Sequence, residues 1–106
     1  MKGFQLEFFL LQNQRRGHQT LWEWLLETAR AQGIRGATVF SGTVGFGHRH
    51  RLHSAHFFEL ADQPVEVTMV VTEEEAERLF ALLMQEKVNA FYVKVPVEFG
   101  TLGEPS

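Results

Sequence analysis

Cysteine is absent from the 106 residues of this chain, and its absence removes several classes of protein from consideration. Without cysteine there is no disulfide scaffold, no thiol nucleophile and no zinc site with cysteine ligands. Long apolar runs are also missing. The run Phe8-Phe9-Leu10-Leu11 leads directly into polar residues and is too short for a signal peptide or a membrane span. The sequence therefore predicts a cytoplasmic protein.

An excess of basic residues is absent as well. Lys and Arg total 10 against 13 Asp and Glu, so the formal net charge is −3 at pH 7. A dedicated nucleic-acid-binding domain is usually basic overall, so this balance argues against a nucleic-acid partner. Asp62 is the only aspartate, and no paired-carboxylate motif stands out. We therefore expect a protein that is not an enzyme.

Hydrophobic residues make up 44% of the chain, and in four segments they follow strand patterns. Apolar residues alternate in residues 4–11 and 65–71, which predicts two half-buried strands. The β-rich composition of residues 37–44 and 91–95 predicts two more strands. Pro96 should limit the last of these, because proline cannot donate a hydrogen bond to a neighbouring strand.

Two helices are marked by their start signals. Thr20 and Thr72 are each followed three residues later by glutamate, which is the capping-box pattern. Apolar residues then recur at helical spacing, so we predict helices over 21–32 and 73–86. Gly33 is placed to end the first helix in a left-handed conformation.

The resulting order is β-α-β, an extra hairpin, and a second β-α-β. It predicts an α+β fold, the ferredoxin-like β-α-β-β-α-β sandwich with an extra hairpin between strands 2 and 3. One domain of residues 1–100 would be followed by a loose tail, 101–106. Residues 12–19 are expected to form a loop, and residues 54–60 an extended segment. Both helices would cover one face of the sheet, and oligomerisation would cover the other.

Residues 42–56 concentrate glycine, arginine and histidine, and include no acidic residue. Backbone N–H groups beside glycines can approach an anion closely, and guanidinium groups supply charge and paired donors. Glycines that simply allow a hairpin to turn are the alternative interpretation. The residues that we assign to a ligand site are Gly42, Gly45, Gly47, Arg49, Arg51 and His53.

Three other interpretations of this segment remain open. His48 and His50 can share one face of an extended chain and bind Zn, Cu or Ni, although the segment offers no cysteine or carboxylate ligand. Gly45-Phe46-Gly47 matches the start of an RNA-recognition signature, but basic residues follow where aromatic residues are needed. A hydrolase could use a serine beside these histidines, but it would also need an orienting acid.

Several short motifs resemble a family of small PII-like proteins, catalogued as a domain of unknown function, number one hundred and ninety. The resemblance covers roughly residues 4–95. It rests on Gly36-Ala37-Thr38-Val39, Gly42, Gly45-Phe46-Gly47, Leu52-His53-Ser54-Ala55, Phe57-Phe58-Glu59-Leu60 and Gln63-Pro64-Val65.

The resemblance implies a regulatory protein that assembles as a homotrimer. It implies a small effector, such as an adenine nucleotide or another anion, bound in clefts between subunits. It also implies a partner protein contacted through residues 42–56, for example a membrane protein of the fluoride-exporter type. A trimer that binds no ligand and only scaffolds its partner is a further alternative.

Two departures from PII signalling proteins concern the phosphate-binding residues. Those proteins carry a glycine- and lysine-rich loop before the last strand, whereas residues 85–89 here read Gln-Glu-Lys-Val-Asn. Their arginines after the last strand have no counterpart in residues 96–106. An anion would therefore rely on Arg49, Arg51 and Lys94.

Overall fold

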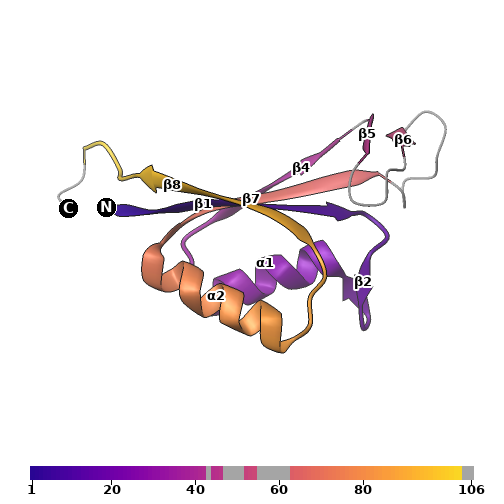
Figure 1. Cartoon of the computed structure of the whole chain (residues 1–106), viewed down its shortest axis with the longest axis horizontal. Helices are drawn as coiled ribbons and strands as arrows, with labels where there is room; N and C mark the ends of the chain where they lie inside the picture. The colour runs from indigo at the N-terminus through magenta and orange to yellow at the C-terminus, as the bar shows by residue number, and fades with distance from the viewer. Residues whose placement is uncertain (43, 47–51, 55–62, 104–106) are drawn as a thin grey trace.

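A four-stranded antiparallel sheet carries two helices on one of its faces (Figure 1). The computed structural model describes residues 1–42, 44–46, 52–54 and 63–103. In chain order the elements are β1 (Lys2–Leu11), β2 (Arg15–Arg16), β3 (Gln19–Thr20), α1 (Leu21–Ala31), β4 (Ala37–Ser41), β5 (Val44–Phe46), β6 (Leu52–Ser54), β7 (Pro64–Thr72), α2 (Glu73–Gln85) and β8 (Phe91–Glu98).

The sheet has the strand order β4-β7-β1-β8, with every neighbouring pair antiparallel. The units β1-α1-β4 and β7-α2-β8 are interleaved, so that β1 and β7 lie in the centre and β4 and β8 form the edges. The predicted ferredoxin-like order is confirmed, and so is the extra hairpin, which β5 and β6 form. Both helices lie on the same side of the sheet, and the opposite side is open (Figure 1).

Alternating apolar residues of the two central strands supply the sheet half of the core. Leu6 and Phe8 of β1 are 0% and 2% exposed, and Val67 and Met69 of β7 are equally well buried. The register pairs Phe8 with Val67 and Leu6 with Met69, so the row of helix-facing side chains continues across both strands. Leu79 of α2, 0% exposed, belongs to the same core. The core therefore lies beneath β1 and β7.

Both predicted capping boxes are present. The backbone N–H of Glu23 donates to the Thr20 hydroxyl over 3.2 Å, and the N–H of Glu75 donates to the Thr72 hydroxyl over 3.1 Å. In the second box the Thr72 N–H also donates to the Glu75 carboxylate over 2.8 Å. These bonds satisfy donors that a helix start leaves unpaired. Within the described ranges, neither helix combines the length and the hydropathy needed to cross a membrane.

The end of α1 follows the predicted glycine stop. Gly33 has φ 86°, and its N–H donates to the Arg30 carbonyl over 3.0 Å. The N–H of Ile34 donates to the Ala29 carbonyl over 3.1 Å. This pair of bonds is the Schellman motif, which requires a left-handed residue where Gly33 stands. Ile34 is buried and belongs to the core, which fixes the direction of the chain as it leaves the helix.

The second predicted strand, 37–44, is shorter in the structure. β4 ends at Ser41, which pairs with Val65 near the start of β7. The Gly42 N–H makes one more bond, to the Pro64 carbonyl over 2.8 Å. The pairing ends there because β7 begins at Pro64, so β4 has no strand to pair with beyond that point.

The predicted limit of the last strand at Pro96 is wrong. β8 runs through Pro96 to Glu98, and Pro96 pairs in register with Phe4. A proline is tolerated in an edge strand, because only one side of such a strand is used by a neighbour. The outer position of β8 therefore explains why the proline does not end it.

The predicted loop 12–19 contains a short hairpin. Arg15 pairs with Thr20, and Arg16 pairs with Gln19, so β2 and β3 form a two-stranded sheet just before α1. Of the predicted extended segment, Ser54 belongs to β6, while residues 55–60 lie outside the described part of the chain. Of the predicted tail, residues 104–106 also lie outside it.

Candidate functional site

The predicted ligand segment leaves the sheet at the end where β4 stops and β7 starts. The Gly42–Pro64 bond joins the two strands at this point, and the Gln12 N–H donates to the Gln63 carbonyl over 2.9 Å. The base of the segment is thus held by the backbones of β4 and β7 and the chain just after β1. From there the β5–β6 hairpin extends away from the helices (Figure 1).

The structure brings two of the predicted ligand residues into direct register. Gly45 of β5 pairs with His53 of β6, while Gly42 lies at the end of β4 beside Pro64. The remaining predicted ligand and metal residues lie outside the described part of the chain; they are Gly47, His48, Arg49, His50 and Arg51. Among the residues that the structure does describe, no three His, Asp or Glu side chains gather as a metal site would require.

A contact that the sequence did not predict joins the β2–β3 hairpin to both helices. The Arg16 guanidinium lies 4.4 Å from the centre of the Trp24 ring and forms an ion pair with the Glu86 carboxylate. Arg16 is therefore held between the start of α1 and the end of α2. Both charged groups are about one-third exposed, and such pairs typically contribute less than about 1 kcal/mol. Their main effect is to position the hairpin.

Trp24 packs against the core, although the helical pattern of the sequence predicts otherwise. In the sequence, the apolar repeat of the first helix consists of Trp22, Leu25, Leu26 and Ala29. This repeat predicts that Trp22 is in the core and that Trp24 lies off the apolar face, where it could meet another subunit. In the structure it is partly buried, packs against the core and carries Arg16 on its ring. Trp22 is also partly buried against the core, as the pattern predicts.

The connection between α2 and β8 ends the helix with the same bonds as α1 but with a different residue. The N–H of Val88 donates to the Leu83 carbonyl over 3.0 Å, and the N–H of Lys87 donates to the Met84 carbonyl over 3.1 Å. Lys87 has φ 57° and occupies the left-handed position that Gly33 takes after α1. Among the described residues with a side chain, Lys87 is the only one in this conformation.

Lys94 lies in a group of aromatic side chains on the helix side of β8. Its ammonium nitrogen is 4.2 Å from the centre of the Phe4 ring and 5.7 Å from that of Phe80. Phe80 meets Tyr92 edge to face, with ring centres 4.9 Å apart. The sequence predicts that Lys94 is exposed, which is confirmed, while its predicted part in binding an anion stays a prediction. The aromatic side chains of this group come from β1, α2 and β8, and no local pattern could reveal that they meet.

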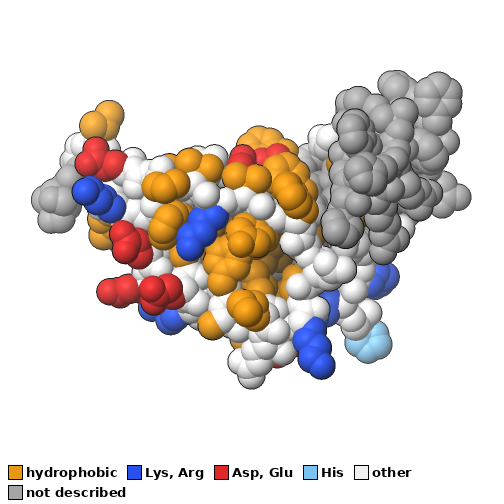
Figure 2. All heavy atoms as spheres, in the orientation of Figure 1, with side chains coloured by type: hydrophobic (Ala, Val, Ile, Leu, Met, Phe, Trp, Pro, Cys, Tyr) orange, Lys and Arg blue, Asp and Glu red, His pale blue; other side chains and the backbone are white. Residues whose placement is uncertain are grey.

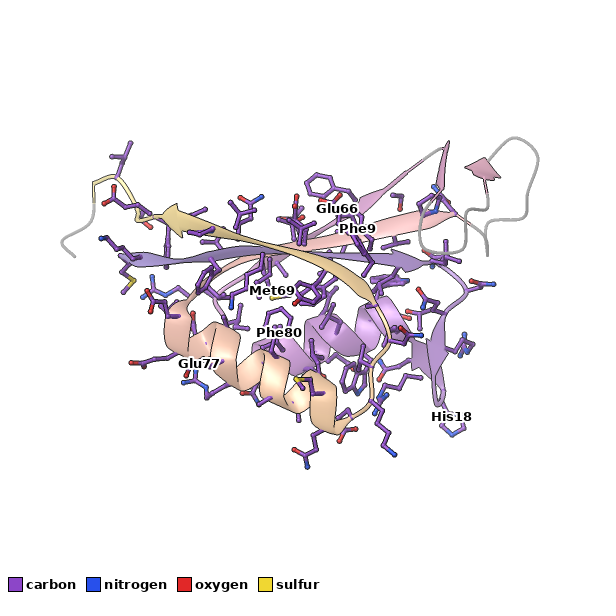
Figure 3. The ribbon with its side chains drawn as sticks, viewed as in Figure 1. Phe9, His18, Glu66, Met69, Glu77 and Phe80 are labelled. Atoms are coloured by element: carbon purple, nitrogen blue, oxygen red, sulfur yellow. The ribbon has the colours of Figure 1, made fainter. Side chains whose placement is uncertain are left out.

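The face of the sheet away from the helices carries exposed apolar side chains. One row across it reads Phe40, Glu66, Phe9 and Phe91, which are neighbours in register on four successive strands. Phe9, Phe40 and Phe91 are 40%, 55% and 59% exposed. In Figure 3, Phe9 and Glu66 lie on this side, and Met69 and Phe80 lie between the sheet and the helices. We call this surface the open face.

Known proteins share both the sequence motifs and the fold of this chain. The model of one protein family, DUF190, described as "Uncharacterized ACR, COG1993", matches residues 3–98. This chain belongs to that family. A relative from Aquifex aeolicus (strain VF5), a UPF0166 protein, is 27% identical over 93 residues, which are 88% of this chain and 89% of the relative.

Solved structures of PII-like proteins share the fold of this DUF190 member. CPII, a nitrogen regulatory PII-like protein from Thiomonas intermedia K12, aligns with a TM-score of 0.70 and 17% identity over 95% of this chain and 91% of CPII. That structure of CPII is bound to ADP, AMP and bicarbonate. A putative PII-like signaling protein from Thermus thermophilus aligns with a TM-score of 0.63 and 19% identity over 91% of this chain and 89% of its own. The chain thus has the fold of PII-like signalling proteins.

Proposed function

We propose that this protein is a PII-like regulator that is not an enzyme. It binds an adenine nucleotide or another small anion in the clefts of a homotrimer and contacts a partner protein through residues 42–56. The observation that carries the proposal is the fold match over 95% of the chain to CPII, a protein solved with ADP, AMP and bicarbonate. The family match over residues 3–98 supports the same assignment.

The open face supports the trimer. In a two-layer fold the helices cover only one face of the sheet. Here the other face exposes three phenylalanines in one row. Phe9 and Phe91 contact each other across β1 and β8, with ring centres 5.7 Å apart. Glu66 separates Phe40 from this pair, but exposed apolar side chains that gather on one face typically mark a protein–protein contact. A subunit interface on the open face would remove these rings from water.

The position of the β5–β6 hairpin supports a role in signalling. The hairpin is attached to the sheet at the ends of β4 and β7 and extends beyond the two-layer body (Figure 1). A segment placed in this way can change its contacts with a partner when a ligand binds at its base, without rearranging the core. The partner class implied by the family resemblance is a membrane protein of the fluoride-exporter type.

Arg49 and Arg51 would supply the charge for the anion. We expect the double variant Arg49→Ala/Arg51→Ala to bind ADP, AMP or bicarbonate at least about tenfold more weakly, because hydrogen bonds to a charged group contribute about 1.5–3 kcal/mol each. Affinity is measured by titration calorimetry, and each ligand is also tested for a concentration-dependent rise of the thermal midpoint. Oligomeric mass is measured on the same samples.

The matched control is Arg30→Ala/Arg35→Ala, which removes the same charge from two exposed positions away from the hairpin. This control should bind as the wild type does. Equal affinities in the two double variants would remove the arginines from the site. A wild-type protein that is stabilised by none of these ligands would favour the ligand-free scaffold instead.

A further inference from the structure

Two carboxylates lie among the phenylalanines of the open face. Glu66 of β7 is in register with Phe40 of β4 on one side and with Phe9 of β1 on the other. Glu7, two residues before Phe9 in β1, projects onto the same face and pairs with Thr68. Glu7 and Glu66 are therefore diagonal neighbours on adjacent strands, a relation that typically places residues about 7–8 Å apart. Figure 3 shows Glu66 beside Phe9 on the side of the sheet away from the helices.

The open face provides no positive charge for these carboxylates. Its positions on β1, β4, β7 and β8 include no Lys, Arg or His, because Lys2 and Lys94 project to the helix side. In the part of the chain that the structure describes, neither Glu7 nor Glu66 forms an ion pair. Glu66 accepts a hydrogen bond from the Thr68 hydroxyl over 2.8 Å. In Figure 2, acidic side chains lie among hydrophobic ones along the upper edge, which is the open side of the sheet.

Both carboxylates are only half-buried in the single chain, so each still contacts water. A cover over the open face would remove Glu66 from water together with the neighbouring phenylalanines. Loss of water disfavours the charged form of a carboxylate, and a second carboxylate nearby acts in the same direction. Within the described strands, the only charged side chain that the neighbours of β7 bring to Glu66 is Glu7. The others are Thr38, Phe40 and Phe9. A covered pair of this kind is therefore stabilised by taking up a proton.

We propose that the open-face carboxylates Glu66 and Glu7 make the assembly of this protein dependent on pH. When a neighbouring subunit covers the open face, a proton from solvent binds to a carboxylate oxygen of the pair, and no other covalent bond changes. The inference rests on the homotrimer of the proposed function and adds a regulatory device to it.

The direction of the effect follows from the number of protons that each state holds. The assembled state holds more protons than the separate chains, so assembly tightens as the pH falls and loosens as the pH rises. Each proton taken up changes the association constant by up to about tenfold per pH unit. The chain also contains five histidines, which titrate in a similar range, so variants have to separate the two contributions.

The experiment measures the association constant of the full-length protein by sedimentation velocity over a dilution series. It is repeated from about pH 5.5 to about pH 8.5 at constant ionic strength, a range in which a covered carboxylate can lose its proton. The variants are Glu66→Gln and Glu7→Gln, which keep the size of the side chain but cannot ionise. Glu77→Gln is the matched control, because it removes the same charge from an exposed position of α2, on the helix side of the sheet (Figure 3). Circular dichroism confirms that each variant is folded.

We expect the wild type to assemble at least about tenfold more tightly at the lower end of this pH range than at the upper end. At the upper end, Glu66→Gln should assemble at least about tenfold more tightly than the wild type, because no charge has to be neutralised, and its pH dependence should be smaller. Glu7→Gln should change assembly in the same direction by a smaller factor. Glu77→Gln should behave as the wild type does, since it keeps both open-face carboxylates and all five histidines.

Two results for Glu66→Gln contradict the inference and leave the homotrimer of the proposed function intact. One is an affinity and a pH dependence equal to those of the wild type. The other is weaker assembly than that of the wild type, because the carboxylate then meets a positive charge of the neighbouring subunit rather than a proton. A wild-type protein that is monomeric at every pH and concentration would overturn both the inference and the homotrimer.

Discussion

Lys87 has a left-handed backbone conformation that favours glycine, so replacing Lys87 with glycine should make the protein more stable. It follows α2 with φ 57°, in the same Schellman motif in which Gly33 follows α1 with φ 86°. A residue with a side chain loses about 1–2 kcal/mol in the left-handed conformation. Glycine avoids this cost but loses about 0.5–1 kcal/mol more conformational entropy on folding.

The difference between the two terms sets the expected size of the effect. We expect Lys87→Gly to raise the free energy of unfolding by about 0.5–1 kcal/mol, which is about 2–8 °C in the thermal midpoint of a chain of this size. Gly33→Ala is the reciprocal variant. A Cβ at Gly33 would meet no atom within 4 Å outside Gly33 and its two chain neighbours, so its cost is purely conformational, and the free energy of unfolding should fall by about the same amount.

Urea unfolding followed by circular dichroism, at one protein concentration for all variants, measures both changes. Lys87→Ala separates the loss of the lysine side chain from the gain of glycine, because alanine keeps the strained conformation. It should resemble the wild type. If Lys87→Gly lowers the free energy of unfolding, or if Lys87→Ala stabilises the protein as much as glycine does, the left-handed conformation is not the cause and the argument is refuted.

Three further predictions concern stability. Leu79→Ala should lower the free energy of unfolding by about 2–5 kcal/mol, because the Leu79 side chain is 0% exposed. Met84 on the same helix is 77% exposed, so Met84→Ala should change the free energy of unfolding by less than about 0.5 kcal/mol. Chemical denaturation compares the two variants, and equal losses would contradict the assigned core. Thr72→Ala should lower the free energy of unfolding by about 1 kcal/mol, because it removes the acceptor for the Glu75 N–H. An unchanged free energy of unfolding in chemical denaturation would mean that this cap is dispensable. Gly3→Ala should lower the free energy of unfolding by about 1–3 kcal/mol, because its methyl group would overlap the Val71 carbonyl oxygen and force the backbones apart. A thermal midpoint equal to that of the wild type would show that β1 moves away from β7 without cost.

The assignment of residues 42–56 to ligand binding stays a prediction from the sequence. The structure describes the base of this segment and the pairing of Gly45 with His53, while Arg49 and Arg51 lie outside the described residues. The two arginines are therefore the first residues to test by substitution.

The sequence by itself determined the elements whose signals are local. Period-two apolar residues placed β1, and capping residues started both helices, because these features depend on hydrogen bonds and burial within one strand or one helical turn. The order of these elements then predicted the ferredoxin-like fold, since right-handed crossovers leave few other arrangements. Gly33 ended α1 as predicted for the same local reason.

Tertiary structure decided everything that depends on which distant residues meet. Arg16 reaches Glu86, 70 positions away, only because the β2–β3 hairpin lies beside the end of α2. Pro96 continues β8 because that strand is at an edge. Lys94 lies on the Phe4 and Phe80 rings because β8 pairs with β1 and Lys94 projects to the side of the sheet where α2 lies. Periodicity gives the face on which a side chain projects, but the order and register of the strands decide what lies opposite that face.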